Sequence, residues 1–570
     1  MISAAKSLKE RRDICMKIKR VMIAAPKSGS GKTVVTCALL QVLKDCGLKV
    51  ASYKCGPDYI DPMFHEKIID VPAKNLDTFF TDEEKTRKLF QKSVMKMDFA
   101  VFEGVMGLYD GVGGVKKEGS SYQLAEVTKT PIVLVVDAKG MGRSIVPLIA
   151  GFLDYDKKHL IKAILLNRMS KGYFELVKPL IEEELKIQVV GFLPENDKLY
   201  IESRHLGLFL PDEVNHIKEK LQAVSELFLQ TVSVERIKEI AESAEELESE
   251  EIAIKETRIE SYGDIGHVKA VSDSRPTIAV AKDEAFCFYY ADNIHLLEEY
   301  GANITYFSPL RDEKLPEGCH ALLIGGGYPE LYAEQLSANT RMREAVRSAV
   351  ENEMPVVAEC GGFMYLHSSL KDKEGFSYDM AGVIPAACYH TGKLVRFGYI
   401  ELREKQKHFL LNGGGIKGHE FHYYDSTCNG ADVIAVKPVT GKEYACIIEN
   451  KTQWIGFPHL YYPSNPAFAR AFIDKARVYQ VMIQERKFGK VSMENSYRFF
   501  ENRNCKYFPC HKGLENLNCL FCYCPLYLRD NCPGNPAYIE KDGRKIKVCT
   551  NCTFPHHPEN YDAVIQILKR

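Results

Sequence analysis

The sequence predicts an α/β protein with two large domains and a small cysteine-rich domain at its C-terminal end. From Val21 onward, continuous Val, Ile and Leu runs alternate with helical patterns, which indicates a parallel sheet covered on both faces. The same alternation begins again near Thr277. From about Asn504 the chain is rich in Cys, Pro, Asn and aromatic residues and is too short for an ordinary core. A chain of 570 residues is also too long for a single core.

These patterns divide the chain into successive segments. We expect a lead-in (1–20), a nucleotide-binding domain (21–232), an acidic helix and linker (233–275), a second α/β domain (276–480), a connector (481–503) and the cysteine-rich domain (504–570). In the acidic segment, apolar residues at helical spacing predict a helix on the surface, with glutamates on its solvated side. These apolar residues are Ile237, Ile240, Ala244 and Leu247.

The composition gives no sign of a nucleic-acid or membrane partner. Lys and Arg number 75 and Asp and Glu 76, so there is almost no net charge to attract either one. No apolar run reaches the ~20 residues of a membrane span, and the charged N-terminal stretch lacks the apolar core of a secretory signal. The cysteines outside the tail show no paired spacing, which is typical of thiols in a reducing cytosol. We therefore expect a cytoplasmic protein.

The stretch APKSGSGKT follows the apolar run RVMIAA and opens a helical pattern, which predicts a loop that binds a nucleotide phosphate. Its glycines let backbone N–H groups point at phosphate oxygens, Lys32 supplies positive charge, and the Thr33 hydroxyl can ligate Mg²⁺. Pro26 replaces the usual first glycine. Lys27 stands five residues before Lys32, which resembles the signature-lysine variant of the septum-site and nitrogenase-iron-protein ATPases. The predicted loop residues are Lys27, Ser28, Gly29, Ser30, Gly31, Lys32 and Thr33.

Acidic residues follow two other predicted strands of the same sheet. KCGPDYIDP contains Lys54, Asp58 and Asp61, and FEGVMGLYDG contains Glu103 and Asp110. Because the carboxyl ends of parallel strands meet at one edge of a sheet, we expect these side chains beside the phosphate loop. The sequence therefore predicts a site for ATP and Mg²⁺.

The motifs SGSGKT, YKCGPDYIDPMFH, NLDTFF and FEGVMGLYDG resemble those of the cobyrinic acid a,c-diamide synthase family, and the resemblance runs from about Val21 to Pro466. It implies a P-loop domain like that of dethiobiotin synthetase, followed by a flavodoxin-like amidotransferase domain. It also implies that ATP phosphorylates two acetate carboxylates of a corrinoid, and that ammonia attacks the mixed anhydrides so formed. Lysines and Mg²⁺ must then screen two anions, and the anhydride must be kept from water.

The resemblance further assigns roles to individual residues. It implies that Thr33, Asp58 and Glu103 hold the metal and that Asp58, Asp61 and Asp110 position the substrate carboxylate or the acyl phosphate. It implies that Tyr59 and Ile60 select which acetate reacts. Lys54 and Asn167 are expected to contact the nucleotide together with the phosphate loop.

A cysteine at a tight turn in the second α/β domain predicts a nucleophile. VVAECGGFMYL indicates a strand, a turn and a helix with Cys360 at the turn, where a helix N-terminus favours the thiolate. Backbone donors at Gly326, Gly327 and Gly361 can bind an oxyanion. GFPHLYYPSNP supplies His459 as a base.

This order of cysteine, glycine loop and late histidine resembles a class I glutamine amidotransferase domain of the cobyrinic and cobyric acid synthase type. The resemblance implies that Cys360 attacks the glutamine amide while His459 shuttles the proton and ammonia is released. Relatives often carry His-x-His before SNP, where this chain has Tyr461, and we name no third acid. His419 and His422 in GHEFHYYD are expected to shape the domain junction rather than to act as the base.

The cysteines close to the C-terminus predict a metal site. Two C-x-x-C pairs have the ligand spacing of a tetrahedral zinc site. So short a chain folds readily only when a metal ion or a covalent cross-link stabilises it. An iron–sulfur cluster is an alternative, and so are disulfides, which a cytosolic enzyme disfavours. The segment resembles a small cysteine-rich domain sometimes fused to corrinoid-synthesis proteins, which implies no role for it. The cysteines are Cys505, Cys510, Cys519, Cys522, Cys524, Cys532, Cys549 and Cys552.

We therefore expect a glutamine-hydrolysing, ATP-dependent amide ligase. Its expected partners are L-glutamine and cobyrinic acid or a related corrinoid, with neither nucleic acid nor membrane, and a homodimer is left open. Hydrogenobyrinate or nickel sirohydrochlorin could replace cobyrinate, since the same motifs serve them. A nucleotide-switched ATPase that binds a protein partner is the alternative from another class, and it leaves the cysteine-bearing domain unexplained.

Overall fold

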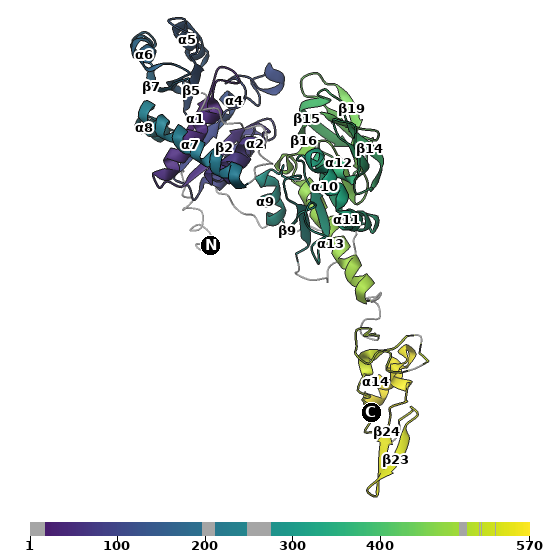
Figure 1. The fold of residues 1–570 in the computed structure, drawn as a ribbon. Helices are drawn as coiled ribbons and strands as arrows, with labels where there is room; N and C mark the ends of the chain where they lie inside the picture. The colour runs from purple at the N-terminus through teal and green to yellow at the C-terminus, as the bar shows by residue number, and fades with distance from the viewer. Residues whose placement is uncertain are drawn as a thin grey trace, which may run out of the picture. The chain divides into compact units, whose positions relative to one another are not determined.

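The computed structural model describes residues 17–195, 211–247, 275–488 and 499–569, apart from residues 512, 515, 530 and 531. The chain divides into two compact units, Met1–Arg477 and Val478–Arg570 (Figure 1). Within the first unit, residues 17–247 are called the first lobe and residues 275–477 the second lobe. The described part of the second unit is called the tail unit. The expected lead-in and linker lie mostly outside the described residues, as do residues 489–498 of the connector, whose first residues belong to a helix that ends at Phe488.

A seven-stranded sheet forms the centre of the first lobe, and every neighbouring pair in it is parallel, as the continuous apolar runs predict. The strand order is β3-β2-β4-β1-β5-β6-β7. Ile23 of β1 pairs with Glu103 of β4, so the phosphate loop and this carboxylate leave the sheet side by side. The strands are β1 (Lys19–Ala24), β2 (Val50–Cys55), β3 (Ala73–Leu76), β4 (Phe99–Glu103), β5 (Ile132–Asp137), β6 (Ile161–Asn167) and β7 (Gln188–Leu193).

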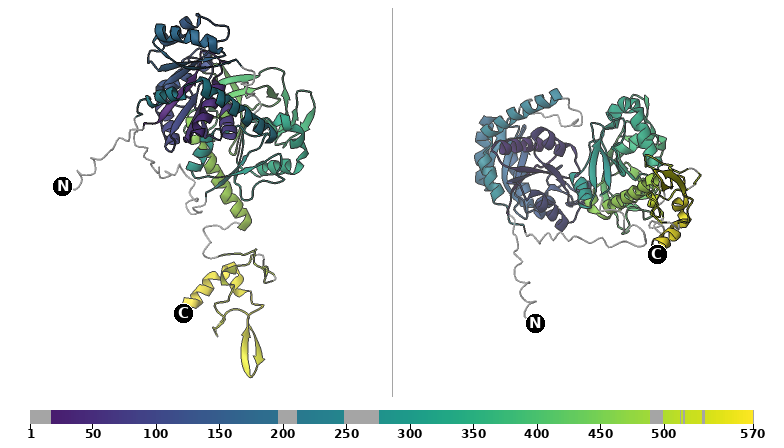
Figure 2. Two further views of the ribbon diagram at one scale, coloured as in Figure 1. Left: turned by 60° about the vertical axis from the view of Figure 1, so that its left-hand side comes forward. Right: turned by 90° about the horizontal axis from the view of Figure 1, so that it is seen from below.

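Helices cover both faces of this sheet and bury a separate apolar core on each (Figures 1 and 2). One core takes side chains from α1 (Lys32–Asp45), α7 (Pro211–Thr231) and α8 (Val234–Glu242). The other takes side chains from α3 (Glu83–Val94), α4 (Ser121–Val127), α5 (Ile145–Tyr155) and α6 (Lys171–Leu185). The short helix α2 (Ile60–Phe64) follows the KCGPDYIDP loop, and a π-helical turn, η1 (His65–Ile69), continues it.

The acidic helix α8 belongs to the first lobe, so the expected boundary at residue 232 is too early. Ile237 and Ile240 are buried in the same core as α1 and α7, and Leu247 is buried against the opposite face. The predicted helix with an apolar side and a glutamate-rich solvated side is confirmed. Its apolar stripe is covered by the sheet of the first lobe, and the glutamates occupy the outer side.

The second lobe contains a six-stranded sheet of order β20-β21-β11-β10-β8-β9, parallel except for the edge pair β20–β21. Two antiparallel-rich sheets, β13-β12-β14-β17 and β19-β18-β15-β16-β22, complete the lobe. The strands of the larger sheet are β8 (Thr277–Ala281), β9 (Asn303–Phe307), β10 (Ala321–Ile324), β11 (Val356–Glu359), β20 (Ile448–Glu449) and β21 (Gln453–Gly456). The remaining strands are β12 (His367–Lys371), β13 (Ser377–Asp379), β14 (Ile384–His390), β15 (Arg396–Glu404), β16 (Ile416–His422), β17 (Tyr424–Ser426), β18 (Val433–Val436), β19 (Glu443–Cys446) and β22 (His459–Leu460). The helices are α9 (Ala291–Glu299), α10 (Ala333–Ala338), α11 (Thr340–Glu351), α12 (Gly361–Leu366) and α13 (Ala467–Phe488).

An aromatic cluster joins the two lobes, and we call it the junction cluster. Polar contacts flank it: the Tyr399 hydroxyl donates to Asp77 at 2.6 Å, and Lys417 donates to the Phe79 carbonyl at 2.6 Å. Apolar burial with bonded polar edges is typical of a stable interface rather than of a passing contact. The cluster consists of Tyr59, Phe79, Phe80, Val112, Tyr290 and Tyr461, with Met63, Leu89, Phe288 and Tyr399 packed against them.

The tail unit has little apolar core of its own. It contains the hairpin β23 (Ala537–Lys541) and β24 (Arg544–Val548) and the helix α14 (Tyr561–Lys569). Its buried apolar residues are Tyr479, Leu517, Leu526, Cys552 and Val564. None of the helices in the described part of the chain combines the length and apolar character that crossing a bilayer requires.

Candidate active site

The phosphate loop of the first lobe connects β1 to α1. Gly29 and Gly31 adopt positive φ angles of 74° and 96°, which side-chain-bearing residues rarely adopt. Asn167 donates to the Ser30 carbonyl at 2.8 Å and lies so close that a Cβ atom on Gly31 would come within 2.1 Å of it. Asn167, expected at the nucleotide, therefore braces the phosphate loop.

Lys32 lies inside this loop and is buried. Its ammonium donates to the Met106 carbonyl at 2.6 Å and to the Lys27 carbonyl at 3.3 Å. Burial and the neighbouring ammonium of Lys54 lower the pKa of Lys32 to about 8, so the side chain is still mainly charged at neutral pH. The Lys27 side chain is exposed at the rim.

Carboxylates from two loops meet around Lys54 at the end of β2. The Lys54 ammonium contacts Asp61, lies 2.9 Å from Glu103 and 3.8 Å from Asp58. Burial would lower the pKa of Lys54, but the Asp61 and Glu103 carboxylates outweigh it and raise the pKa. Glu103 also accepts the Thr33 hydroxyl at 2.7 Å, which ties this cluster to the phosphate loop. The expected convergence of strand ends is thus present.

The cluster has the chemistry of a Mg²⁺ site. Oxygen Oε2 of Glu103 is buried without a hydrogen-bond partner and lies 3.5 Å from His65 Nε2, which also has none. Among the residues that the structure describes, no three acidic, His or Cys side chains are gathered as they would be around an ion, because Lys54 lies between the carboxylates. Mg²⁺ usually takes only one or two protein carboxylates and completes its shell with water and substrate phosphates. Thr33, Glu103 and Asp58 fit that pattern.

Two other predicted residues make local contacts, although the charge of Asp110 also acts on the Lys32 ammonium. Asp110 accepts the backbone N–H of Gly107 at 2.9 Å, which shapes its own loop. Ile60 opens α2 and packs against the core of the first lobe.

Cys360 lies at the turn between β11 and α12. Its φ of 49° and ψ of −102° are strained for a residue with a side chain, a state that costs about 1–3 kcal/mol and recurs at functional sites. Burial and the nearby Glu330 carboxylate raise the pKa of the thiol well above its ordinary value. At rest Cys360 is therefore a neutral thiol, in contrast to the favoured thiolate expected from the sequence, and it needs a base.

His459 on β22 lies where that base is required. The imidazole packs on Gly326, where a Cβ atom would come within 2.3 Å of its Cε1. Gly361, next to Cys360, lies beside the Gly327 backbone nitrogen, so histidine, cysteine and the glycine loop converge. Burial lowers the pKa of His459 to about 3, which keeps the imidazole neutral and able to accept a proton.

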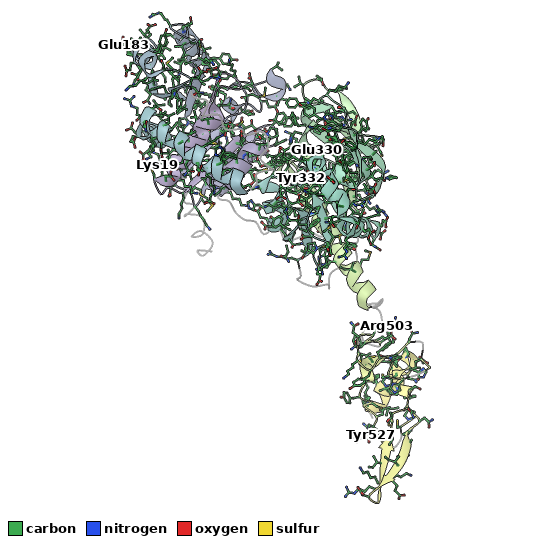
Figure 3. All side chains as sticks on the ribbon, viewed as in Figure 1. Lys19, Glu183, Glu330, Tyr332, Arg503 and Tyr527 are labelled. Atoms are coloured by element: carbon green, nitrogen blue, oxygen red, sulfur yellow. The ribbon has the colours of Figure 1, made fainter. Side chains whose placement is uncertain are left out.

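The structure shows two carboxylates that the sequence reasoning missed. Glu359 directly precedes Cys360, is buried, and places Oε2 3.9 Å from Nδ1 of His459. Glu330, labelled in Figure 3, follows the glycine loop, and burial raises its pKa to about 7. Both stand in the motifs AECGG and GGGYPE, but neither shows its neighbours in the sequence alone.

Of the other two predicted histidines, His419 lies at the junction beside Tyr59, whereas His422 stacks on Phe457 with ring centroids 4.0 Å apart. His419 stacks on His459 with ring centroids 4.9 Å apart and is hydrogen-bonded to the Tyr290 hydroxyl at 3.2 Å. Tyr461 stands where relatives often have a second histidine. Its hydroxyl donates to Asp292 at 2.8 Å, and its ring stacks on Phe80.

The structure joins none of the eight cysteines of the tail unit in a disulfide. A cavity of about 820 Å³ is lined by Cys510, Cys522, Cys524, Cys549 and Cys552 together with His511 and His556. In the described tail, no three of these groups stand at the spacing that a bound ion would impose.

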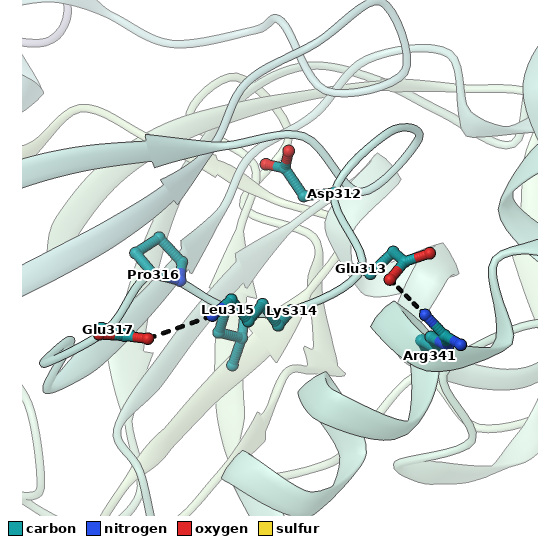
Figure 4. A pocket seen from close by; sticks show the side chains of 7 residues that line it. All are labelled: Asp312, Glu313, Lys314, Leu315, Pro316, Glu317 and Arg341. Carbon is teal, nitrogen blue, oxygen red and sulfur yellow. Dashed lines mark hydrogen bonds and ion pairs between the residues drawn. The ribbon is translucent and has the colours of Figure 1, made fainter.

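A further pocket, of about 670 Å³, lies on the second lobe (Figure 4). Residues 312–317 and Arg341 line it, and Lys314 pairs with Glu317 at 3.1 Å across exposed side chains. It contains none of the candidate site residues.

Comparison with known proteins matches three family models to the chain. They are the CobQ/CobB/MinD/ParA nucleotide binding domain (residues 21–208), the CobB/CobQ-like glutamine amidotransferase domain (residues 277–456) and the Cysteine-rich small domain (residues 496–570).

The chain also resembles whole proteins. It is 37% identical over 459 residues to a cobyrinate a,c-diamide synthase of Caldanaerobacter subterraneus, which covers 80% of this chain and 97% of that protein. It is 37% identical over 458 residues to the protein of that name from Listeria innocua, with 79% and 98% coverage. The protein of that name from Thermoplasma volcanium is 37% identical over 408 residues, with 71% and 86% coverage.

Proposed function

We infer the function from the family to which the chain belongs, which is the cobyrinate a,c-diamide synthase family. The chain is a glutamine-hydrolysing, ATP-dependent ligase of cobalamin biosynthesis that converts the a and c acetate carboxylates of cobyrinic acid to amides. The observation that carries this conclusion is the presence of two chemical centres in one compact unit. One gathers lysines and carboxylates at a phosphate loop, and the other gathers Cys360, His459 and a glycine loop.

Activation belongs to the first lobe. The carboxylate oxygen of the substrate bonds to the γ-phosphorus of ATP, the bond to the bridging oxygen breaks, and ADP and an acyl phosphate result. Lys32 and Lys54 screen the repulsion between these two anions. Thr33, Glu103 and Asp58 would hold Mg²⁺, which supplies further charge neutralisation when bound.

Ammonia is produced in the second lobe. His459 takes the proton of the Cys360 thiol as sulfur attacks the amide carbon of glutamine. The backbone N–H groups of the glycine loop stabilise the oxyanion. Ammonia leaves with a proton from the imidazolium, and water then hydrolyses the thioester to glutamate. The ammonia attacks the acyl phosphate, phosphate leaves, and a primary amide remains.

Glu330 is a candidate for the ammonium group of the substrate glutamine. Its charge contributes to the raised pKa of the Cys360 thiol, so it lies near the nucleophile. No partner cation is found for it among the described residues. A substrate ammonium would supply one, and it would favour the ionised carboxylate.

The apolar face of the corrinoid has a matching surface on the second lobe. Phe397 and Phe421 are direct partners on β15 and β16, with ring centroids 5.7 Å apart, and are 62% and 52% exposed. Tyr399 and His419, two residues along each strand, lie on the same face within or against the junction cluster. The exposed pair therefore continues the junction outward, and aromatic rings suit the flat face of a tetrapyrrole.

For the tail unit we propose two zinc sites of four cysteines each. Cys532 and Cys552 sulfurs both lie beside Gly534, and burial together with the charges of Cys524, Cys552 and Cys532 raises the pKa of Cys549. Burial and the charges of Cys510 and Cys522 raise the pKa of Cys519, whose sulfur also accepts the Asn502 N–H. The proposed sets are Cys524, Cys532, Cys549 and Cys552, and Cys505, Cys510, Cys519 and Cys522.

The amidation is tested directly with the purified chain, ATP, Mg²⁺ and glutamine. Mass spectrometry should show two successive amidations of cobyrinate, and label from amide-¹⁵N glutamine should appear in both products. Parallel reactions with hydrogenobyrinate and nickel sirohydrochlorin identify the preferred tetrapyrrole. Nucleotide-dependent dimerisation without glutamine turnover would refute the ligase. Metal analysis of the full chain should give about two zinc ions per molecule. Iron with a visible charge-transfer band would instead show that the cysteines hold an iron–sulfur cluster.

A further inference from the structure

Tyr59 connects the two chemical centres directly. Its ring centroid lies 5.3 Å from that of His459, 5.1 Å from that of Phe288, on which it stacks, and 4.5 Å from that of Tyr290. The side chain is only 7% exposed. A residue expected to select the acetate is thus buried against the base of the other lobe.

The residues beside Tyr59 belong to the activation centre. Asp58 accepts the Ile60 N–H at 2.8 Å and lies 3.8 Å from the Lys54 ammonium, which Asp61 also contacts. A cation that binds here must compete with Lys54 for Asp58 and Asp61, and a carboxylate must compete with these two residues for Lys54. The backbone that carries the Tyr59 ring is therefore fixed by contacts that substrate binding must alter.

The same loop reaches His459 by a second route. The Tyr290 hydroxyl lies 3.4 Å from the Pro57 carbonyl and 3.2 Å from Nδ1 of His419. His419 in turn stacks on His459 with an interplanar angle of 15°. The imidazole of His459 thus packs against two rings, Tyr59 and His419, which also contact each other with ring centroids 5.7 Å apart. Contiguous contacts of this kind can transmit a change from one site to another.

We propose that Tyr59 is a positioning residue that couples glutamine hydrolysis to carboxylate activation, an inference that rests on the proposed function. At rest the Tyr59 ring holds the His459 imidazole and fills the space beside it, so glutamine is not hydrolysed without an acceptor. When ATP and the substrate carboxylate bind and take over the Lys54 contacts of Asp58 and Asp61, the loop shifts and the ring moves. His459 then takes the Cys360 proton, and ammonia passes to the acyl phosphate.

Two ratios test this coupling in the full-length enzyme. The first is the stimulation of glutamine hydrolysis by cobyrinate with ATP, and the second is glutamine hydrolysed per amide formed. In Tyr59→Ala we expect the stimulation to fall by about 5-fold to 150-fold, the usual range for coupling between sites, and the second ratio to rise well above that of the wild type. Tyr59→Phe should keep both ratios, because the ring contacts remain.

Phe79→Ala is the matched control. Phe79 is a similarly buried ring of the junction cluster that contacts Phe80 and Tyr399 but not His459. Should Tyr59→Ala fail to fold, Tyr59→Leu fills most of the volume without a ring.

The inference is overturned if Tyr59→Ala shows the same two ratios as Phe79→Ala, or if Tyr59→Phe behaves like Tyr59→Ala. It is also overturned if cobyrinate and ATP do not change the rate of glutamine hydrolysis by the wild type. Absence of amide from every tetrapyrrole would refute the proposed function itself. Coupled amidation with an unaffected Tyr59→Ala would refute only the role of Tyr59.

Discussion

Replacing Glu359 by glutamine should show how the imidazolium of His459 is stabilised when it forms. Glu359 lies 3.9 Å from Nδ1 of His459 and accepts the Leu460 N–H at 3.4 Å. Glutamine keeps the size and the acceptor oxygen but cannot carry a charge. The substitution therefore removes the stabilisation of the imidazolium that forms when Cys360 loses its proton.

The size of the effect follows from the distance and the pKa. Two unit charges 3.9 Å apart attract by about 4 kcal/mol at an effective dielectric constant near 20. Burial raises the pKa of Glu359 to about 8, so ionising it at pH 7 costs about 1.4 kcal/mol. The net stabilisation is about 3 kcal/mol, or about a hundredfold in rate. Because Glu359 must be ionised, the wild-type rate of glutamine hydrolysis should rise as pH rises through about 8. The pH–rate profile of Glu359→Gln should lack this rise.

The raised pKa of Glu359 also gives a stability test with a definite sign. The folded state holds this proton more tightly than the unfolded state. The resulting stabilisation is complete below the unfolded pKa and is lost as pH rises through about 8. Glu359→Gln should unfold with a weaker pH dependence over that interval, as measured by denaturant titration.

The assay compares glutamine-driven with ammonia-driven amidation. Glu359→Gln should lose about a hundredfold in kcat/KM for glutamine and retain the ammonia-driven reaction, which does not use His459. Glu449→Gln is the control, because that glutamate is as buried and has a pKa raised to about 8, yet it lies on β20. A loss below about threefold, or an equal loss with ammonia, would refute the assignment of Glu359.

Further predictions concern the two centres and the substrate surfaces. Cys360→Ser should abolish glutamine-driven amidation and keep the ammonia-driven reaction; failure of ammonia to restore amidation would contradict the division of labour. Lys32→Ala should stop amidation with either nitrogen source, and retained activity would remove the phosphate loop from the chemistry. Glu330→Gln should raise KM for glutamine about tenfold or more, the value of a charged hydrogen bond, with little change in KM for cobyrinate. Alanine at both Phe397 and Phe421 should raise KM for cobyrinate about tenfold or more, while KM for ATP and glutamine stays unchanged.

The local patterns of the chain predicted much of the fold. Continuous Val, Ile and Leu runs identified the buried parallel strands because a strand covered on both faces has no polar side. The loop between β1 and α1 was found because only glycine adopts its backbone readily. The role of α8 was not found, since a helical stripe of apolar residues does not reveal what covers it.

The candidate site divides in the same way. Lys32, Glu103, Cys360 and His459 were predicted because each stands in a motif whose chemistry depends on residue type and spacing. The sequence shows Glu359 next to Cys360, but the role of Glu359 depends on its contact with His459 on β22, about a hundred residues later. A pairing at such separation leaves no periodic signal in the chain.

By itself, the sequence determined the two α/β domains, the phosphate loop and the nucleophile, because these follow from neighbouring residues and their spacing. Only the tertiary structure decided that His459 lies against Glu359, that the Cys360 thiol is neutral at rest, and that Tyr59 is buried at the junction. These facts depend on burial and on contacts between distant segments. They arise only when packing removes the groups from water and places them together.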